Sequence, residues 1–165
     1  MTQVLQISDT HLVQEGALVS STLDTAGPLR RLVVRITELQ EEVGALDAII
    51  VSGDVSDDGS PESYELFKSI LSPLNLPTYA VPGNHDQRAS FRTAFSTAGY
   101  LPKSGKLNWH KTLGHLQIIG LDTLIEGQGG GELDTETLDF LEAQLRQLHG
   151  SPVICLLYTS DAADE

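Results

Sequence analysis

The sequence has 165 residues, which is enough for one domain with a hydrophobic core. Apolar residues make up 40% of the chain, an ordinary share for a globular protein. Ten Lys and Arg residues against 23 Asp and Glu residues give a formal net charge of -13. Because surfaces that bind nucleic-acid polymers are basic, we expect no such partner. A small anionic ligand is compatible with this charge if bound metal ions supply positive charge locally.

The single cysteine, Cys155, cannot form an internal disulfide bond, which is consistent with a reducing compartment. The first residues contain no basic segment followed by an apolar one, so we expect no signal peptide. No apolar run approaches the roughly 20 residues that cross a membrane. These features predict a cytoplasmic protein with no membrane partner.

Strand and helix patterns alternate along the chain, which favours an α/β layered domain. The strands are predicted, in chain order, at 3–8, 47–52, 78–81, 107–109, 115–121 and 152–157. Helices with apolar residues at helical spacing are predicted at 24–43, 61–71, 89–98 and 135–148. The run at 47–52 is continuously apolar and rich in β-branched residues, which is typical of a parallel strand covered on both faces.

Two details of burial follow from these patterns. The last helix is predicted to face the core with a stripe of leucines, namely Leu138, Leu141, Leu145 and Leu148. Cys155 lies in a strand that we expect to be buried, and we interpret it as a small apolar filler.

Polar side chains follow three of the predicted strands at the point where each strand ends. Asp9 and His11 follow the first strand, Asp54 follows the second, and Asn84 and His85 follow the third. Open α/β sheets bind their ligands at the carboxyl ends of their strands. We therefore expect these five side chains to meet at one edge of the sheet.

These residue types indicate a metal site. A carboxylate beside an imidazole suits Fe, Mn or Zn better than Ca or Mg. If the first strand extends far enough, Asp9 and His11 point to the same side because they are two residues apart. The two oxygens of Asp54 can bridge two cations, and Asn84 offers a neutral carbonyl ligand. His85 could serve as an acid or as a contact to phosphate.

Other polar residues have structural interpretations. Asp86 could orient His85 or cap the helix that follows it. Asp57 and Asp58 are interpreted as turn residues. The remaining histidines are interpreted as surface or strand residues, namely His110, His115 and His149.

Three segments of the chain resemble the first three motifs of the calcineurin-like metallophosphoesterases. They are Asp9-Thr10-His11, Gly53-Asp54 and Gly83-Asn84-His85-Asp86. Finer features resemble the bacterial class III cyclic-nucleotide phosphodiesterases, among them Leu121-Asp122-Thr123 followed by 130–134. The resemblance covers about residues 3–157 and implies a two-sheet β-sandwich flanked by helices.

The resemblance also implies roles for individual residues. Asp9, His11 and Asp54 would hold one metal ion, Asp54 and Asn84 would contribute to a second, and His85 would be the catalytic histidine. Two such ions, each Fe, Mn or Zn, activate water for attack on phosphorus.

The implied function is hydrolysis of a small phosphodiester, in the first place a 3′,5′-cyclic nucleotide to its 5′-monophosphate. A glycerophosphodiester or another small phosphoester is the alternative substrate. An alternative of another class is a non-catalytic metal-binding or interaction module.

The sequence departs from the family pattern after the last predicted strand. The family has a His-His pair there and a Gly-His-x-His motif later, whereas this chain has Tyr158-Thr159 and ends at Glu165. The segment 156–165 resembles translated adapter sequence. We therefore interpret residues 1–157 as the N-terminal portion of the phosphoesterase domain and 158–165 as a foreign tail. The alternative is a genuinely short protein. With these ligands missing, we expect little or no phosphodiesterase activity. Because the second half of the sandwich would also be missing, we expect exposed strand edges and apolar helix faces.

Overall fold

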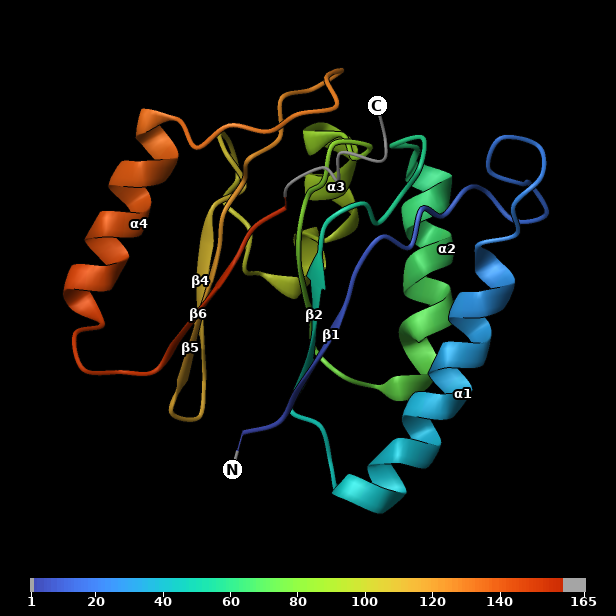
Figure 1. The fold of residues 1–165 in the computed structure, drawn as a ribbon, viewed down its shortest axis with the longest axis horizontal. Coiled ribbons are helices and arrows are strands. Elements are labelled where there is room, and N and C mark those ends of the chain that lie inside the picture. Colours follow the sequence, from blue (N-terminus) through green and yellow to red (C-terminus); the bar gives the residue numbers. More distant parts are fainter. Residues whose placement is uncertain (1, 159–165) are drawn as a thin grey trace.

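The computed structural model describes residues 2–158, and Figure 1 shows two sheets with helices on their outer sides. Apart from Tyr158, the tail interpreted as foreign lies outside the described residues. The layered α/β architecture and the two sheets agree with the predicted fold class. In the described part of the chain, no helix is both long enough and apolar enough to cross a membrane.

The first sheet contains three parallel strands in the order β1-β2-β3. β1 is Val4–Ile7, β2 is Ala48–Ser52 and β3 is Thr78–Val81. Every residue of the central strand β2 is buried, as its continuous apolar run predicts. Because all three strands run the same way, their carboxyl ends open on one edge of the sheet.

The second sheet has the order β4-β5-β6, with β4 and β5 antiparallel and β5 and β6 parallel. β4 is Trp109–Leu113, β5 is Leu116–Gly120 and β6 is Val153–Leu156. The prediction of a strand at 107–109 is wrong. The strand instead begins at Trp109 and continues to the tight turn at Gly114, whose φ is 59°, and it pairs with β5 up to the end of the hairpin.

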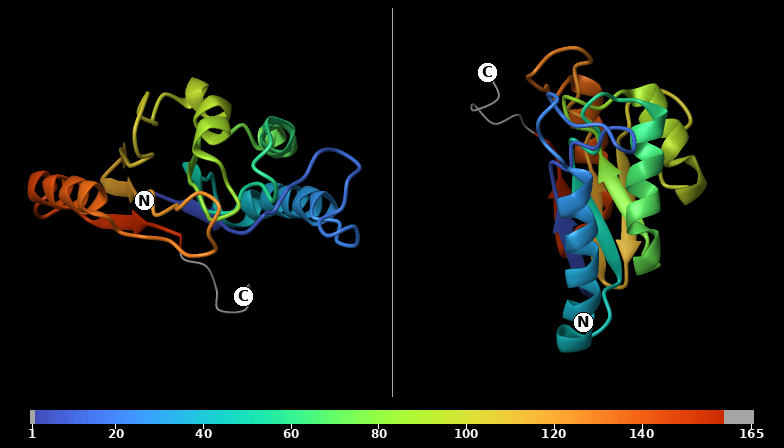
Figure 2. Two further views of the ribbon diagram at one scale, coloured as in Figure 1. Left: turned by 90° about the horizontal axis from the view of Figure 1, so that it is seen from above. Right: turned by 90° about the vertical axis from the view of Figure 1, so that its right-hand side faces the viewer.

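Three helices cover the first sheet and a fourth lies beside the second, as the left view of Figure 2 shows. The helices are α1 (Ala26–Val43), α2 (Pro61–Leu71), α3 (Arg88–Ala94) and α4 (Thr135–Gln147). Short 3-10 turns follow α2 and α3, namely η1 (Ser72–Leu74) and η2 (Ser96–Ala98). The helix predicted to reach residue 98 thus ends at Ala94 and continues only as a turn.

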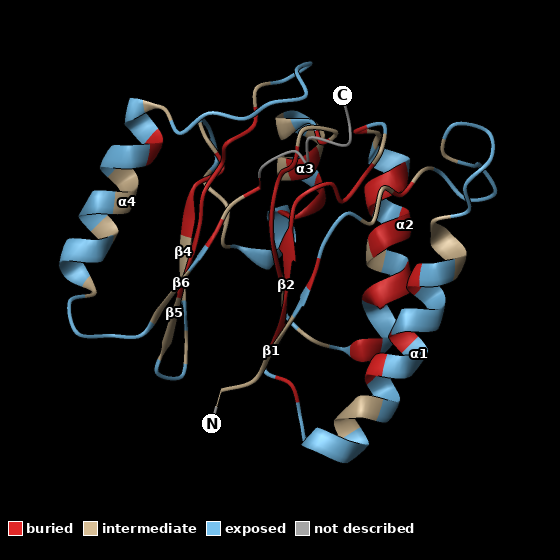
Figure 3. Cartoon of the chain, viewed as in Figure 1, coloured by how far each residue is buried: buried red, intermediate tan, exposed pale blue. Residues whose placement is uncertain are grey.

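Two hydrophobic cores hold these layers together (Figure 3). The larger core lies between the first sheet and the helices α1, α2 and α3. The smaller core lies between the sheets and contains Ala48, Ile50, Tyr79, Val81, Trp109, Ile118 and Leu156. Alternate residues of β2 face the two cores, which therefore lie on opposite faces of the first sheet.

Only part of the predicted leucine stripe of α4 faces the protein, and the prediction is wrong for Leu138 and Leu145. Leu138 and Leu145 are 47% and 46% exposed, and the buried residue of the helix is Thr137. The helix contacts the protein along a line that starts at Thr137 and continues through the partly buried Phe140 and Leu141. Leu141 and Leu148 of the stripe are therefore partly buried, whereas Leu138 and Leu145 lie on the flank of the helix.

The prediction that Cys155 is a buried filler is also wrong, because its side chain is exposed. Cys155 lies opposite Ile119 in β6. Among the described residues β6 is an edge strand, so one of its sides has no neighbouring strand to cover it.

Trp109 joins the two sheets and provides a test of the fold. Its side chain is 2% exposed, and its Nε1 donates a hydrogen bond of 2.9 Å to the carbonyl of Ala80 in β3. We expect Trp109→Phe, which leaves this carbonyl only the longer hydrogen bond of 3.5 Å from the hydroxyl of Tyr100, to lower the free energy of unfolding by about 1–3 kcal/mol. Trp109→Ala should cost about 3–5 kcal/mol.

Urea unfolding measures both losses. Leu32→Ala is the control because Leu32 lies on α1 and is 38% exposed. A loss for Trp109→Phe no larger than that of the control would contradict this role of Trp109.

Candidate metal centre

The loops after β1 and β2 bring three of the predicted ligands together. The ligand atoms of Asp9, His11 and Asp54 all lie within 4.8 Å of one another. Asp54 is fully buried, His11 is partly buried and Asp9 is exposed. The group therefore joins a buried carboxylate to ligands that solvent reaches.

The backbone of this group explains how the residues meet. Asp9, His11 and Asp54 have φ values of 55°, 40° and 45°, in the left-handed region that residues other than glycine seldom adopt. β1 ends at Ile7, so the condition under which an extended strand would carry Asp9 and His11 to one side is not met. Backbone hydrogen bonds instead hold the loop, from Asp9 N to the carbonyl of Gly53 and from His11 N to that of Asp54. Such backbone geometry clusters at functional sites.

The Asp54 carboxylate is the central acceptor of the site. Its Oδ1 accepts a hydrogen bond of 2.9 Å from the backbone N–H of His85. Its Oδ2 accepts one of 2.6 Å from the hydroxyl of Tyr158 and lies 3.6 Å from Nε2 of His11. The two carboxylate oxygens thus face different sets of neighbours.

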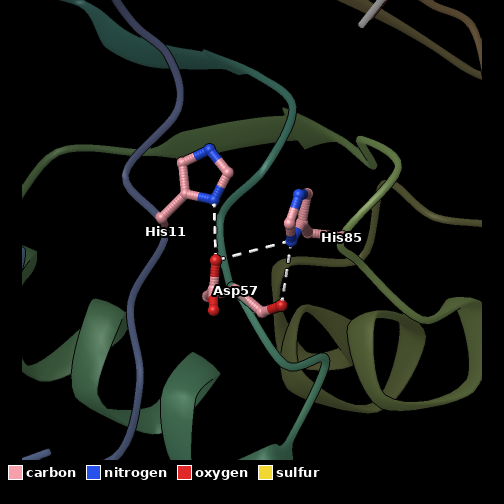
Figure 4. A group of neighbouring side chains, drawn as sticks. All are labelled: His11, Asp57 and His85. Atoms are coloured by element: carbon pink, nitrogen blue, oxygen red, sulfur yellow. Dashed lines mark hydrogen bonds and ion pairs between the residues drawn. The ribbon is translucent and has the colours of Figure 1, made fainter. Parts of the chain in front are cut away.

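Asp57 connects the two histidines of the site, as Figure 4 shows. Its Oδ1 lies 3.1 Å from Nδ1 of His11 and 3.4 Å from Nδ1 of His85, and its carbonyl oxygen lies 3.1 Å from the same atom of His85. The rings of His11 and His85 meet edge to face, with their centroids 4.7 Å apart. The interpretation of Asp57 as a mere turn residue missed these contacts. Its position three residues after Asp54, in the same loop, was the available signal.

These contacts determine which nitrogen of each ring is available. Carboxylate and carbonyl oxygens accept hydrogen bonds, so Nδ1 of both His11 and His85 carries the donated proton. Nε2 of neutral His11 then presents a lone pair toward the carboxylate group, the orientation that a metal-binding imidazole needs. Nε2 of His85 is correspondingly free to take or give a proton.

Asn84 has the feature expected of a neutral metal ligand. Its Oδ1 is buried and has no hydrogen-bond partner in the described part of the chain. A buried acceptor without a partner costs free energy. A cation at this position would remove that cost, so the residues present fit a metal ion.

Asp86 fulfils neither of its two predicted roles. Its side chain is 2% exposed, and α3 begins after Gln87 without a side-chain cap. The carboxylate accepts hydrogen bonds from backbone N–H groups and one hydroxyl, namely those of Gly83, Val55, Ser56 and Tyr64. Asp86 therefore ties the loop after β3 to the loop after β2.

The environments of two acids shift their pKa in opposite directions. Burial raises the pKa of Asp86 to about 6, although its hydrogen bonds act to lower it. Burial also opposes ionisation of Asp58, but hydrogen bonds from Ser60, Ser63 and Ser56 outweigh it and lower the pKa of that carboxyl. Asp58 thus stays ionised in neutral solution.

We predict that Asp86 makes stability depend on pH between its ordinary pKa of 3.8 and its folded value of about 6. The folded state holds this proton more tightly than the unfolded state. Its contribution to stability is therefore complete below about pH 3.8 and is lost as the pH rises to about 6. Asp86→Asn removes the titration.

The measurement is the free energy of unfolding against pH for the native chain and for Asp86→Asn. The native value minus the variant value should fall between pH 4 and 6. The exposed Asp139, changed to Asn, is the control and should give a flat difference. A difference that rises across this interval would contradict the prediction.

Comparisons with known proteins identify the family of the chain. Residues 2–157 match the family of calcineurin-like phosphoesterases. The "Probable glycerophosphodiester phosphodiesterase GpdQ" of Arcobacter nitrofigilis is 32% identical over 155 residues, which cover 94% of this chain and 56% of the relative. The "3',5'-cyclic adenosine monophosphate phosphodiesterase CpdA" of Pseudomonas aeruginosa is 35% identical over 138 residues, which cover 84% of this chain and 47% of the relative. The chain therefore spans about half the length of these curated relatives.

Two solved structures have a similar fold at low sequence identity. The protein TT1561 of Thermus thermophilus has a TM-score of 0.63 at 19% identity, covering 96% of this chain and 68% of that one. Purple acid phosphatase PPD1 from yellow lupin has a TM-score of 0.59 at 13% identity, and the match covers 88% of this chain and 27% of that one. The likeness concerns the fold alone, whereas the family match extends over nearly the whole sequence. The chain belongs to the calcineurin-like phosphoesterase family, with the α/β fold of two sheets flanked by helices.

Proposed function

We propose that this chain carries the first part of a metal-dependent phosphodiesterase site, in which Asp9, His11 and Asp54 hold one metal ion. The observation that carries the proposal is the approach of their ligand atoms to within 4.8 Å at the carboxyl edge of the parallel sheet. Asp54 and Asn84 would contribute to a second ion, because Asp54 has a second oxygen and Oδ1 of Asn84 has no hydrogen-bond partner among the described residues. Fe, Mn or Zn suits this mixture of carboxylate, imidazole and amide ligands.

The bound ions would supply the activation of water and the neutralisation of charge on the phosphoryl oxygens. The protein's own contribution is orientation and proton transfer. The carbonyl of Asp57 accepts the hydrogen bond from Nδ1 of His85 and so holds the ring in place. Nε2 of His85 can then deliver a proton to the leaving oxygen or stabilise the charge that develops there.

The proposed substrate is a small phosphodiester. Relatives named for cyclic nucleotides and for glycerophosphodiesters are both similar to this chain. We place a 3′,5′-cyclic nucleotide first, with the 5′-monophosphate as its product, and a glycerophosphodiester second. The net charge of -13 disfavours a polymeric nucleic acid as substrate.

A second function, a non-catalytic metal-binding module, is favoured by one observation. The hydroxyl of Tyr158 donates to Oδ2 of Asp54, an oxygen that a bridging carboxylate would give to a metal ion. We further propose that Tyr158 and the residues after it are a foreign tail, so that Tyr158 occupies the place of a histidine ligand.

The metal centre is tested by titration with Mn²⁺ in a calorimeter. We expect the chain to bind one ion weakly, and we expect His11→Ala to reduce the affinity by more than about 10-fold because it removes a ligand. His110→Ala is the control, since His110 lies in β4 and is hydrogen-bonded to Gln117. Equal affinities for the two variants would refute the proposed ligand set.

Catalysis is tested by replacing Tyr158. With only Asp54 and Asn84 for the second ion, we expect the chain to hydrolyse little or no bis(p-nitrophenyl) phosphate in Mn²⁺. Tyr158→His adds an imidazole beside Asp54, so this variant should bind Mn²⁺ more tightly and hydrolyse the diester. Tyr158→Phe removes the hydroxyl without adding a ligand and is the matched control.

The outcomes separate the two functions. Tight binding of two ions by Tyr158→His without hydrolysis would favour the non-catalytic module. Hydrolysis that His85→Ala abolishes would support the phosphodiesterase.

A further inference from the structure

A cavity of about 700 Å³ opens beside His85. His85 and Asn84 line it from the loop after β3, Asp57 and Asp58 from the loop after β2, and Glu126 from the loop after β5. Because His85 and Asn84 also belong to the candidate metal centre, a phosphodiester held there would extend one of its two alcohol groups into the cavity.

The side chains that line the cavity include several carboxylic acids and no Lys or Arg among the described residues. Four of the described residues that line it are carboxylic acids, namely Asp57, Asp58, Asp86 and Glu126. The net charge of the whole chain, -13, has the same sign as that of the ionised acids.

Two of these carboxylates are held in place by hydrogen bonds. Oδ1 of Asp58 accepts from the backbone N–H of Ser60 at 2.9 Å and from the hydroxyl of Ser63 at 2.8 Å. Oε1 of Glu126 accepts from the backbone N–H of Arg88 at 2.9 Å. Neither side chain can turn away from the cavity without losing these bonds, so both charges are fixed features of its wall.

The nearest arginine is directed elsewhere. The guanidinium of Arg88 makes two hydrogen bonds to the fully buried Asp122, at 2.7 and 3.0 Å, and a third to the carbonyl of Leu124. A bidentate pair of this kind is rigid. The guanidinium is thereby hydrogen-bonded to Asp122, it attracts Glu126 only through space, and Arg88 is not among the residues that line the cavity.

We propose that this cavity receives the organic group that carries the leaving oxygen, which in a cyclic nucleotide is the nucleoside itself and in an open phosphodiester is the leaving alcohol. It selects groups that are neutral or positively charged over groups that carry a further negative charge. Glu126 and Asp58 are the residues that determine this selectivity, because they place fixed carboxylates where the leaving group lies. The inference rests on the proposed phosphodiesterase site and specifies its substrate class by charge.

The experiment uses three methyl phosphodiesters that differ only in the second alcohol. In methyl phosphocholine this alcohol is cationic, in ethyl methyl phosphate it is neutral, and in methyl phosphoglycolate it carries a carboxylate. Their dissociation constants are measured by calorimetry on the full chain in saturating Mn²⁺. We expect the cationic probe to bind about 10-fold more tightly than the anionic one, with the neutral probe between them.

Glu126→Gln is the test variant, because the amide oxygen can still accept the hydrogen bond from Arg88. It should reduce the difference between the cationic and anionic probes to about threefold. Glu142→Gln changes the net charge by the same amount at an exposed position on α4 and should leave the difference unchanged.

The outcomes distinguish this inference from the proposed function. If no probe binds although Mn²⁺ does, both are overturned. If all three probes bind with equal affinity, or if the two variants reduce the difference equally, the charge selectivity alone is overturned.

Discussion

The buried carboxylate of Asp54 is the point on which the whole edge of the sheet depends. The backbone N–H of His11 donates to its carbonyl, and His85 and Tyr158 donate to its side chain, so loops from three different strands meet at this one residue. Gly83 leaves the space that this requires, because a Cβ there would lie 2.2 Å from Oδ1 of Asp54. The fold thus closes around a carboxylate rather than around an apolar side chain.

Such an arrangement has an electrostatic cost. Asp54 and Asp86 are both buried, and the hydrogen bonds that they receive come from backbone groups and tyrosine hydroxyls rather than from Lys or Arg. A buried charge is stable only when it is paired, hydrogen-bonded or bound to a metal. Asp86 meets this requirement through hydrogen bonds alone. Asp54 lies beside two further ligands, which is consistent with the metal ion that we propose for it.

The second sheet supports the site through an ion pair and a hydrogen bond. Asp122, at the end of β5, holds Arg88 and so fixes the start of α3 directly after the loop that carries His85. Trp109 from the same sheet is anchored to β3, the strand that leads into this loop. The sandwich of two sheets therefore supports the loop of His85 from both of its ends.

The sequence alone determined the order and type of the elements, because apolar periodicity and the breaks at Gly and Pro are local signals. It also identified the polar residues that follow these strands, namely Asp9, His11, Asp54, Asn84 and His85. They meet because parallel strands have their carboxyl ends on the same edge of the sheet. Only the tertiary structure decided that Asp57 joins the two histidines and that Asp86 ties two loops. It also decided that Leu138 and Leu145 of α4 lie on its flank and that Cys155 is exposed. These outcomes depend on left-handed backbone turns and on the neighbours that each face meets, and neither is encoded in the spacing of residues along one segment.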